Sequence, residues 1–323
     1  MKNVDKLYIV IPCYNEEAVL YETKCRLKEK MIDMIKKNMI SNSSRIVFCD
    51  DGSNDRTWSI IKEMHEKDPM ILGIKLSRNR GHQNTLLGGL LTVKDACDMV
   101  ISMDADLQDD IEVIDQFIEC YYAGCEIVYG VRSSRKTDTF FKKFTAESFY
   151  KFMNKMGVEI IYNHADYRLM SKKALNELSR FKEVNLFLRG IIPMIGFKTE
   201  CVTYERKPRF AGKSKYPLKK MLGFALDGIT SLSIKPIRFI TSLGFILFAI
   251  SIALLIHFIL GYIMGRTIEG WATLVISIWG IGGLQLLAIG IIGEYIGKIY
   301  LETKERPRFI VEEYLNDDNG ELK

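Results

Sequence analysis

The N-terminal part of the chain alternates short apolar runs with longer amphipathic segments. Apolar runs of this length predict strands, and apolar residues spaced by three and four predict helices. We expect strands at Leu7–Cys13, Arg45–Cys49, Ile71–Leu76, Met99–Met103 and Glu126–Val131. We expect helices between them at about 16–38, 56–67, 83–95 and 111–122. The alternation predicts an α/β fold with helices covering a mainly parallel sheet.

Polar segments follow the first four expected strands directly. In chain order they are IPCYNEE, CDDGSND, LSRNRGHQN and MDADLQDD. Right-handed crossovers gather the carboxyl ends of parallel strands along one edge of the sheet, where ligands of such sheets bind. We therefore expect a ligand crevice at that edge.

Two long uncharged segments, Phe239–Met264 and Trp271–Ile292, lie near the C-terminus. Each exceeds the roughly 20 residues that span a bilayer, so we predict two transmembrane helices. The alternative is a buried helical hairpin of a soluble protein. Basic residues flank the pair on both outer sides: Lys235 and Arg238 before it, and Lys298, Lys304, Arg306 and Arg308 after it. The positive-inside rule then predicts a multi-pass protein of the inner (plasma) membrane with its large domain and both termini cytosolic.

The expected division is a cytosolic domain at 1–234, a two-helix anchor at 235–298 and a cytosolic tail at 299–323. Aromatic residues and lysines at helical spacing predict amphipathic helices in the membrane interface at about 138–157 and 217–230. The alternative for both is a basic solvated face on an ordinary core helix. The tail is expected to contain a short strand. This strand and the glycines of the second span favour a homo-oligomer.

Composition narrows the picture further. The seven cysteines are odd in number and form no CxxC pair, which predicts free thiols in a reducing compartment. The net charge of +5 comes from basic residues interleaved with acidic ones, and no nucleic-acid recognition module is present in the sequence. We therefore expect the lipid bilayer, and no nucleic acid, as a partner.

Asp104 and Asp106 follow the fourth expected strand. Strand alternation would send both carboxylates to one side, where they could hold a hard divalent cation with Gln108 as a further ligand. Such a cation clamps a diphosphate and stabilises the charge of the leaving group. The alternative is an acidic cluster at a helix start, with Asp109 or Asp110 as the cap. Both roles can coexist.

Asp51 lies at the end of the second expected strand, in the segment DDGS. It could accept hydrogen bonds from a nucleotide base, or the segment could simply form a turn. Asp55 or Thr57 is expected to cap the next helix. His82 and His164 are interpreted as hydrogen-bonding scaffold in preference to metal ligands.

The four polar segments, together with GVRSSR, HADYRLM, NLFLRG and RKPRFAGKSKY, resemble family 2 glycosyltransferases of the GT-A fold. The later segments resemble the polyprenyl-phosphate branch, which includes dolichyl-phosphate mannose synthases and bactoprenol glucosyltransferases. The resemblance covers nearly the whole chain. It implies a Rossmann-like GT-A domain that transfers a hexose from a nucleotide sugar to undecaprenyl (polyprenyl) phosphate, with inversion and with Mg²⁺ or Mn²⁺. The product would serve cell-envelope glycosylation. UDP-glucose is the favoured donor, and UDP-N-acetylhexosamine and GDP-mannose are the alternatives.

The resemblance also assigns roles where its motifs match this sequence. The nucleotide-sugar site would comprise Pro12, Tyr14, Asn15, Glu16, Asp51, Asn79, Asp104 and Gln108. The metal ligands would be Asp104, Asp106 and Gln108, and the catalytic group would be Asp166, Asp106 and Arg132. A mobile loop closing over the site would contain Arg206, Arg209, Lys213, Ser214 and Lys215. The acidic motif departs from the family at Asp110, where proline is frequent, and we expect metal binding to be unaffected.

The chemistry of a lipid phosphate favours the same function. A phosphate monoester is largely dianionic at pH 7, so it needs cations beside it more than a general base. Arg132, Arg135 and Lys143 stand next to the first expected interface helix and could bind the acceptor phosphate. The alternative is generic attraction to anionic lipid. Asp166 could be a base, an orienter of acceptor or sugar, or the partner of Arg168.

Three other functions fit the sequence less well. A processive polysaccharide synthase would need more than two spans and a QxxRW motif, which this sequence lacks. A non-catalytic nucleotide-binding membrane scaffold would not need the acidic motif, the arginines and the lysine-rich loop together. A lipid transporter is disfavoured by two spans.

Overall fold

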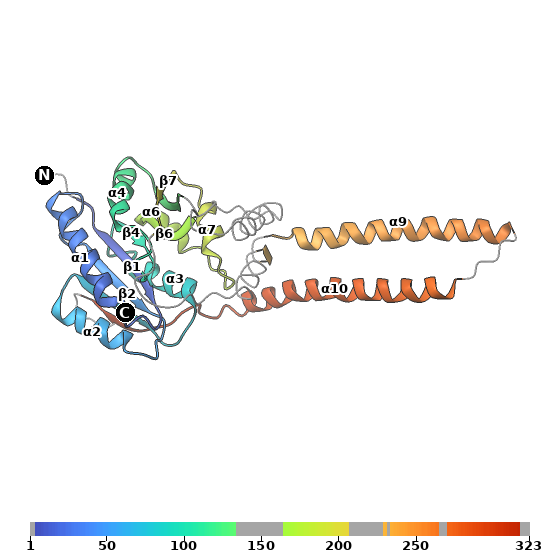
Figure 1. The fold of residues 1–323 in the computed structure, drawn as a ribbon, viewed down its shortest axis with the longest axis horizontal. Coiled ribbons are helices and arrows are strands. Elements are labelled where there is room, and N and C mark those ends of the chain that lie inside the picture. The colour runs from blue at the N-terminus through green and yellow to red at the C-terminus, as the bar shows by residue number, and fades with distance from the viewer. Residues whose placement is uncertain (1–3, 134–163, 207–228, 231–232, 265–269, 317–323) are drawn as a thin grey trace.

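The computed structural model describes residues 4–133, 164–206, 229–230, 233–264 and 270–316 (Figure 1). Its strands are β1 (Leu7–Cys13), β2 (Arg45–Asp50), β3 (Ile71–Leu76), β4 (Met99–Ser102), β5 (Ile127–Arg132), β6 (His164–Ser171), β7 (Thr199–Tyr204) and β8 (Val311–Leu315). Its helices are α1 (Leu20–Lys36), α2 (Thr57–Lys67), α3 (His82–Val93), the 3₁₀ helix η1 (Ile111–Val113), α4 (Ile114–Tyr122), α6 (Lys172–Leu178), α7 (Leu188–Met194), α9 (Lys235–Ile263) and α10 (Trp271–Thr303).

The strands form one sheet, in the order β7-β5-β6-β4-β1-β2-β3-β8, with helices on both faces. β1 is apolar throughout and buried throughout, as a strand covered on both faces must be. Its Leu7, Ile9 and Ile11 pack with α1, α2 and α4. Its Tyr8 and Val10 pack with α3, α6 and α7 on the other face. The result is a three-layer α/β/α domain.

The mainly parallel α/β sheet predicted from the sequence is confirmed, and each of the five expected strands is present within about a residue of its expected bounds. The pairs β1–β2, β2–β3, β1–β4 and β5–β7 are parallel. β6 was not predicted. It lies between β4 and β5 and runs antiparallel to both. The charged Arg168 interrupts its apolar pattern, yet this side chain is only 1% exposed because it pairs with Asp166.

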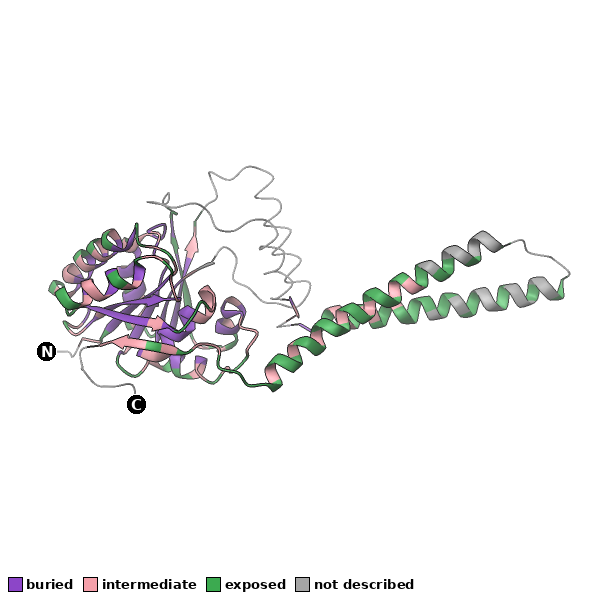
Figure 2. Ribbon diagram, turned by 90° about the horizontal axis from the view of Figure 1, so that it is seen from below, coloured by how far each residue is buried: buried purple, intermediate pink, exposed green. Residues whose placement is uncertain are grey.

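α9 and α10 extend side by side away from the domain (Figure 1). Their described large apolar side chains are largely exposed, for example Phe245 at 71% and Leu286 at 72% (Figure 2). Within the described residues, one helical segment, Gly280–Thr303, is long and apolar enough to cross a membrane by length and composition. The two predicted spans are therefore not confirmed as a pair. The alternative of a buried hairpin does not fit, because this segment is unburied.

The chain after α10 returns to the domain. As predicted, it contains a short strand, β8, which pairs antiparallel with β3 at the edge of the sheet. All seven cysteines are free, also as predicted. The interface helices expected at about 138–157 and 217–230 lie outside the described residues, apart from 229–230.

Helix α3 approaches the sheet very closely at Gly89. A Cβ atom at this position would lie 2.4 Å from the Sγ of Cys49 and 2.6 Å from a methyl group of Val10. Both neighbours are short, buried side chains that have little room to move. The glycine is therefore required by packing, and it brings the start of α3 close to the strand ends.

We predict that Gly89→Ala lowers the free energy of unfolding by about 1–3 kcal/mol, because overpacking outweighs the gain of about 1 kcal/mol in helix propensity. Thermal unfolding of the detergent-solubilised protein measures the loss. Gly280→Ala in α10, where an added Cβ meets open space, is the matched control and should not lower stability. Equal melting temperatures for Gly89→Ala and the unsubstituted protein would contradict the packing argument.

Candidate active site

The loops after β1 and β2 are bonded to each other at the carboxyl edge of the sheet. Asn15 adopts a positive φ of 53°, its amide donates to Ser53 Oγ at 2.9 Å, and its Oδ1 accepts from the amide of Asn54 at 2.9 Å. The amide of Glu16 donates to Thr57 Oγ1 at 2.9 Å. These bonds hold the residues after β1 in turns, which is why α1 begins at Leu20 and not at the predicted residue 16.

Asp51 joins the second loop to the third. Its Oδ1 accepts from the amide of Arg80 at 2.6 Å and its Oδ2 from the amide of Gly81 at 2.9 Å. The turn itself is made by the preceding Asp50, which accepts from the amide of Ser53 at 3.2 Å. Asp51 is thus a buried tether of the β3–α3 loop. Each of its oxygens keeps a second lone pair, and its predicted contact with a nucleotide base stays a prediction.

The acidic motif lies in a loop and not on a strand. β4 ends at Ser102, so the expectation that strand alternation places Asp104 and Asp106 on one side is wrong. A turn forms instead: Leu107 has a φ of 56°, and the amide of Gln108 donates to Asp106 Oδ1 at 3.2 Å. The side-chain oxygen of Gln108 accepts from Arg206.

Asp109 is buried below this turn. Its Oδ1 accepts from the Tyr204 hydroxyl and from Arg132 Nη2, the latter at 3.5 Å. Its Oδ2 has no hydrogen-bond partner among the described residues. Burial first, and then the charge of Asp104, raise the pKa of Asp109 to about 6. Of the two residues predicted as the cap, Asp109 and Asp110, it is Asp110 that caps η1: its side chain accepts from the amide of Glu112 at 3.3 Å.

Asp166 is the most heavily bonded acid of the site. Its Oδ1 accepts from Arg168 at 2.5 Å, and Arg189 binds both oxygens, at 3.3 and 3.0 Å. Burial opposes ionisation, but Arg189, His82 and Arg168 outweigh it and hold the pKa of Asp166 well below its usual range. The reversed direction of β6 brings Asp166 to the same edge as the carboxyl ends of the parallel strands.

His82, at the start of α3, connects Asp166 to the acidic loop. Its Nε2 lies 3.5 Å from Asp166 Oδ2 and 3.7 Å from Asp104 Oδ1. This fits the scaffold role predicted for it. Arg189 lies in the segment NLFLRG, but its role is not predictable from the sequence, because nothing there places this arginine beside Asp166.

These contacts join the loops after β1, β2, β3, β4, β5 and β7 and the start of β6 into one arrangement, here called the strand-end cluster. Its members are Asn15, Asp51, His82, Asp104, Asp106, Gln108, Asp109, Arg132, Asp166, Arg189, Tyr204 and Arg206. The predicted crevice edge is therefore where the polar side chains meet.

The remaining predicted site residues are dispersed around this edge. Pro12 is buried at the end of β1, Tyr14 is half-buried just after it, and Asn79 is exposed in the β3–α3 loop. The predicted acceptor and loop residues outside the described part of the chain are Arg135, Lys143, Arg209, Lys213, Ser214 and Lys215.

A cation fits the acidic loop on electrostatic grounds. The described residues hold no group of three or more His, Cys, Asp or Glu that could bind a metal by itself. Mg²⁺, however, is commonly held by one or two carboxylates plus substrate phosphates. Asp104 and Asp106 both raise the pKa of Asp109, which indicates an excess of negative charge that a divalent cation would offset. Gln108 could join as a ligand only by exchanging its bond to Arg206.

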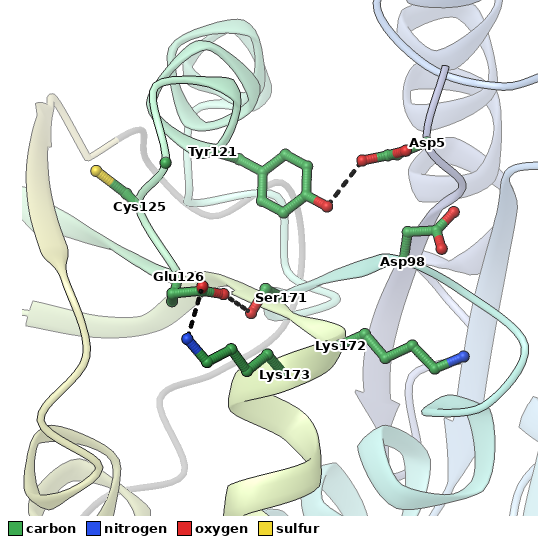
Figure 3. A pocket seen from close by; sticks show the side chains of 9 residues that line it. Asp5, Asp98, Tyr121, Cys125, Glu126, Ser171, Lys172 and Lys173 are labelled. Carbon is green, nitrogen blue, oxygen red and sulfur yellow. Dashed lines mark hydrogen bonds and ion pairs between the residues drawn. The ribbon is translucent and has the colours of Figure 1, made fainter. Parts of the chain in front are cut away.

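A separate cavity of about 320 Å³ lies at the opposite edge of the sheet, where β1 and β4 begin (Figure 3). Its polar side chains largely bind one another: Tyr121 donates to Asp5 at 2.8 Å, and Lys173 pairs with Glu126 at 3.3 Å. It shares no residue with the strand-end cluster.

We predict that Arg189→Gln lowers the free energy of unfolding by about 1–3 kcal/mol at pH 7, because buried Asp166 loses one of its cationic partners. The loss is not larger because Arg168 and His82 remain beside Asp166. The folded pKa of Asp166 lies below its unfolded value of about 3.9. Its contribution to stability is therefore present above about pH 4 and lost as the pH falls towards the folded pKa. The difference in free energy of unfolding between the variant and the unsubstituted protein should narrow below about pH 4 in urea titrations.

The control is Arg180→Gln, which removes a surface ion pair with Glu177. Its free energy of unfolding should stay within about 0.5 kcal/mol of that of the unsubstituted protein. A constant difference from pH 3 to pH 7 would contradict this account.

The chain is similar to several known glycosyltransferases. YkoT of Bacillus subtilis (strain 168), named as an uncharacterized glycosyltransferase, is 57% identical over 306 residues, covering 95% of this chain and 91% of its own. The bactoprenol glucosyl transferase of Shigella phage SfX is 40% identical over 312 residues, covering 95% of this chain and 98% of its own. The solved mannosyltransferase PcManGT of Pyrobaculum calidifontis, in complex with GDP-Man and Mn²⁺, has a TM-score of 0.44 at 14% identity and covers 91% of this chain and 88% of its own.

The family model described as glycosyl transferase family 2 matches residues 8–179. This range runs from β1 through α6 and contains the acidic loop, His82 and Asp166. It accounts for the α/β, GT-A-like sheet and for the polar loops at its carboxyl edge. The chain is a glycosyltransferase and belongs to glycosyl transferase family 2.

Proposed function

We propose that this enzyme transfers a hexose from a nucleotide sugar, with UDP-glucose as the first candidate, to a polyprenyl phosphate at the cytosolic face of a membrane. The observation that carries the proposal is the 40% identity to the bactoprenol glucosyl transferase of phage SfX over 95% of this chain. A prophage bactoprenol glucosyl transferase homolog of Escherichia coli (strain K12) is 38% identical over the same share. An alignment over this share of the chain extends over both the domain that carries the strand-end cluster and the two long helices.

The charges of the strand-end cluster suit two anionic substrates. Acidic groups, Asp104 and Asp106, stand on one loop, and the cations Arg132 and Arg206 contact that loop from the ends of β5 and β7. Guanidinium forks bind phosphate oxygens in a fixed geometry. We therefore assign to Arg132 the binding of a substrate phosphate during the reaction, the role that the resemblance implies for it.

The proposed step is an in-line displacement. A lone pair of the acceptor phosphate oxygen forms a bond to the anomeric carbon, and the bond from that carbon to the donor diphosphate breaks, its electron pair leaving with the nucleotide. The configuration at the anomeric carbon inverts. No proton has to be removed, since the phosphate is already largely dianionic at pH 7. Asp166, ionised and held by Arg168 and Arg189, is assigned to orienting the substrates.

Asp104 and Asp106, with Gln108, are proposed to hold Mg²⁺ or Mn²⁺. When bound, such an ion neutralises charge that develops on the departing diphosphate. The residues supply oxygen ligands of the kind these ions prefer. UDP-N-acetylhexosamine and GDP-mannose remain the alternative donors.

We also propose that α9 and α10 both cross the membrane, joined by a short external loop, so that domain 1–234 and the tail from 299 are cytosolic. The exposed apolar side chains along both helices support this arrangement. The basic residues at both outer ends support the orientation. A lipid-linked acceptor would then reach the cytosolic domain at the ends of the two helices.

Asp104→Asn and Asp106→Asn are each expected to lower the turnover number at least about 100-fold, because the leaving diphosphate loses its electrostatic partner. The assay uses purified protein, undecaprenyl phosphate, Mn²⁺ and a panel of UDP- and GDP-sugars, with lipid-linked sugar as the readout. Asp95→Asn, an exposed acid outside the cluster, is the control and should keep full activity. Nucleotide binding without sugar transfer by the unsubstituted protein would instead favour a non-catalytic scaffold.

The orientation is tested by labelling with a membrane-impermeant maleimide. Thr267→Cys, in the loop between the two helices, is expected to react from outside intact cells. The exposed native Cys25 and Cys201, both in the cytosolic domain, should react only after lysis and form an internal control. Reaction of these two from outside would overturn the topology.

A further inference from the structure

The cytosolic end of α10 is hydrogen-bonded to the catalytic domain through one carboxylate. Both oxygens of Glu302 lie 2.9 Å from the amide nitrogen of Val184, and Oε1 accepts from the amide of Asn185 at 3.0 Å and from its side-chain Nδ2 at 3.2 Å. Hydrogen bonds to an ionised acceptor are about twice as strong as neutral ones. Backbone amides that are half-buried need such a partner. Glu302 therefore fixes the loop 181–187 to the end of the helix.

A second contact from the same segment reinforces the first. Arg308 Nη1 donates to the carbonyl of Phe181 at 2.8 Å. The chain then packs Phe309 against Gly88 of α3 and enters β8, which pairs with β3. In Figure 1 the chain leaves α10 and enters the domain close to α3. The loop is thus attached to a segment that is itself anchored in the sheet.

The attached loop leads directly into the strand-end cluster. Three residues after Asn185 the chain enters α7, whose Leu188 amide donates to Gln83 Oε1 at 2.8 Å. The next residue, Arg189, binds both oxygens of Asp166. Gln83 adjoins His82, which faces Asp166 and Asp104. The backbone that carries Arg189 is therefore fixed at two points, by Glu302 of α10 and by Gln83 of α3.

We propose that Glu302 is a positioning residue of the transfer reaction: by binding the amides of Val184 and Asn185 it sets Arg189 against Asp166 and couples the orientation of α10 to the active site. This inference rests on the proposed function, since it gives Asp166 a place beside the reacting groups. It assigns a role in catalysis to a side chain at the membrane helix, outside the strand-end cluster and outside the range of the family model.

The test compares three single variants of the full-length enzyme in the lipid-linked sugar assay. Glu302→Ala is expected to lower kcat about 10- to 100-fold, with the KM for the donor changed by less than about 3-fold, as for loss of an outer supporting contact. Glu302→Gln keeps an acceptor oxygen and should recover kcat to within about 5-fold. Glu312→Ala, which removes an exposed ion pair with Lys75 in the same segment, is the matched control and should keep kcat.

A double-variant cycle separates positioning from general destabilisation. Arg189→Lys keeps the charge and loses the bidentate fork, so it lowers activity by itself. If Glu302 acts through Arg189, adding Glu302→Ala to the Arg189→Lys variant should lower kcat by less than about 3-fold further. A double variant whose loss of kcat equals the product of the two single losses would overturn the proposal. So would a Glu302→Ala variant that keeps the kcat of Glu312→Ala.

Hydrogen exchange distinguishes failure of this inference from failure of the proposed function. The amides of Val184 and Asn185 should be protected in the unsubstituted protein and exchange faster in Glu302→Ala, whatever reaction is catalysed. Faster exchange with unchanged kcat would overturn the positioning role alone. Absence of lipid-linked sugar from the unsubstituted enzyme, with these amides protected, would overturn the proposed function and leave the contact standing.

Discussion

The ion-pair cluster around Asp166 is the interaction on which the rest of the site depends. One buried carboxylate is shared by Arg168 from its own strand, Arg189 from α7 and His82 from α3, so three elements that are far apart in the chain meet at one charge. Removing ions from water is costly, and such a cluster is stable only when each charge is well paired. Arg168 Nε and Nη1 have no partner among the described residues, and burial lowers the pKa of Arg168. The cluster therefore gives a defined arrangement more than it gives stability.

The direction of β6 explains why the polar groups gather at one edge of the sheet. β6 reverses the direction of the sheet between β4 and β5, and this reversal is what places a strand start, and hence Asp166, among strand ends. The acidic loop after β4 faces it through His82, and Arg132 and Tyr204 hold the base of that loop through Asp109. Basic and acidic side chains are thereby held in contact at one edge of the sheet.

The sequence predicted those features that local pattern controls. The apolar runs of β1 to β5 and the polar segments behind them located the sheet and its polar edge, and Asp110, which caps η1, was one of the two predicted candidates for a cap. Features that depend on distant partners were missed. β6 was hidden by Arg168, a charged residue that is buried because Asp166 of the same strand pairs with it. The alternation argument for Asp104 and Asp106 failed because β4 stops at Ser102, where Ser102 Oγ turns to the carbonyl of Asp166 at 2.6 Å. Arg189 could not be placed, since its position is set by tertiary contacts of α7.

The edge strand β8 has a consequence for how the protein can be divided. It covers the outer edge of β3, and Trp58 and Lys62 of α2 bind its Glu313. Cutting the chain before α9 to obtain a soluble enzyme would also discard this strand and leave the amides and carbonyls of β3 open to pairing with another molecule. The long helices therefore cannot be removed by a single cut without also removing a strand of the sheet.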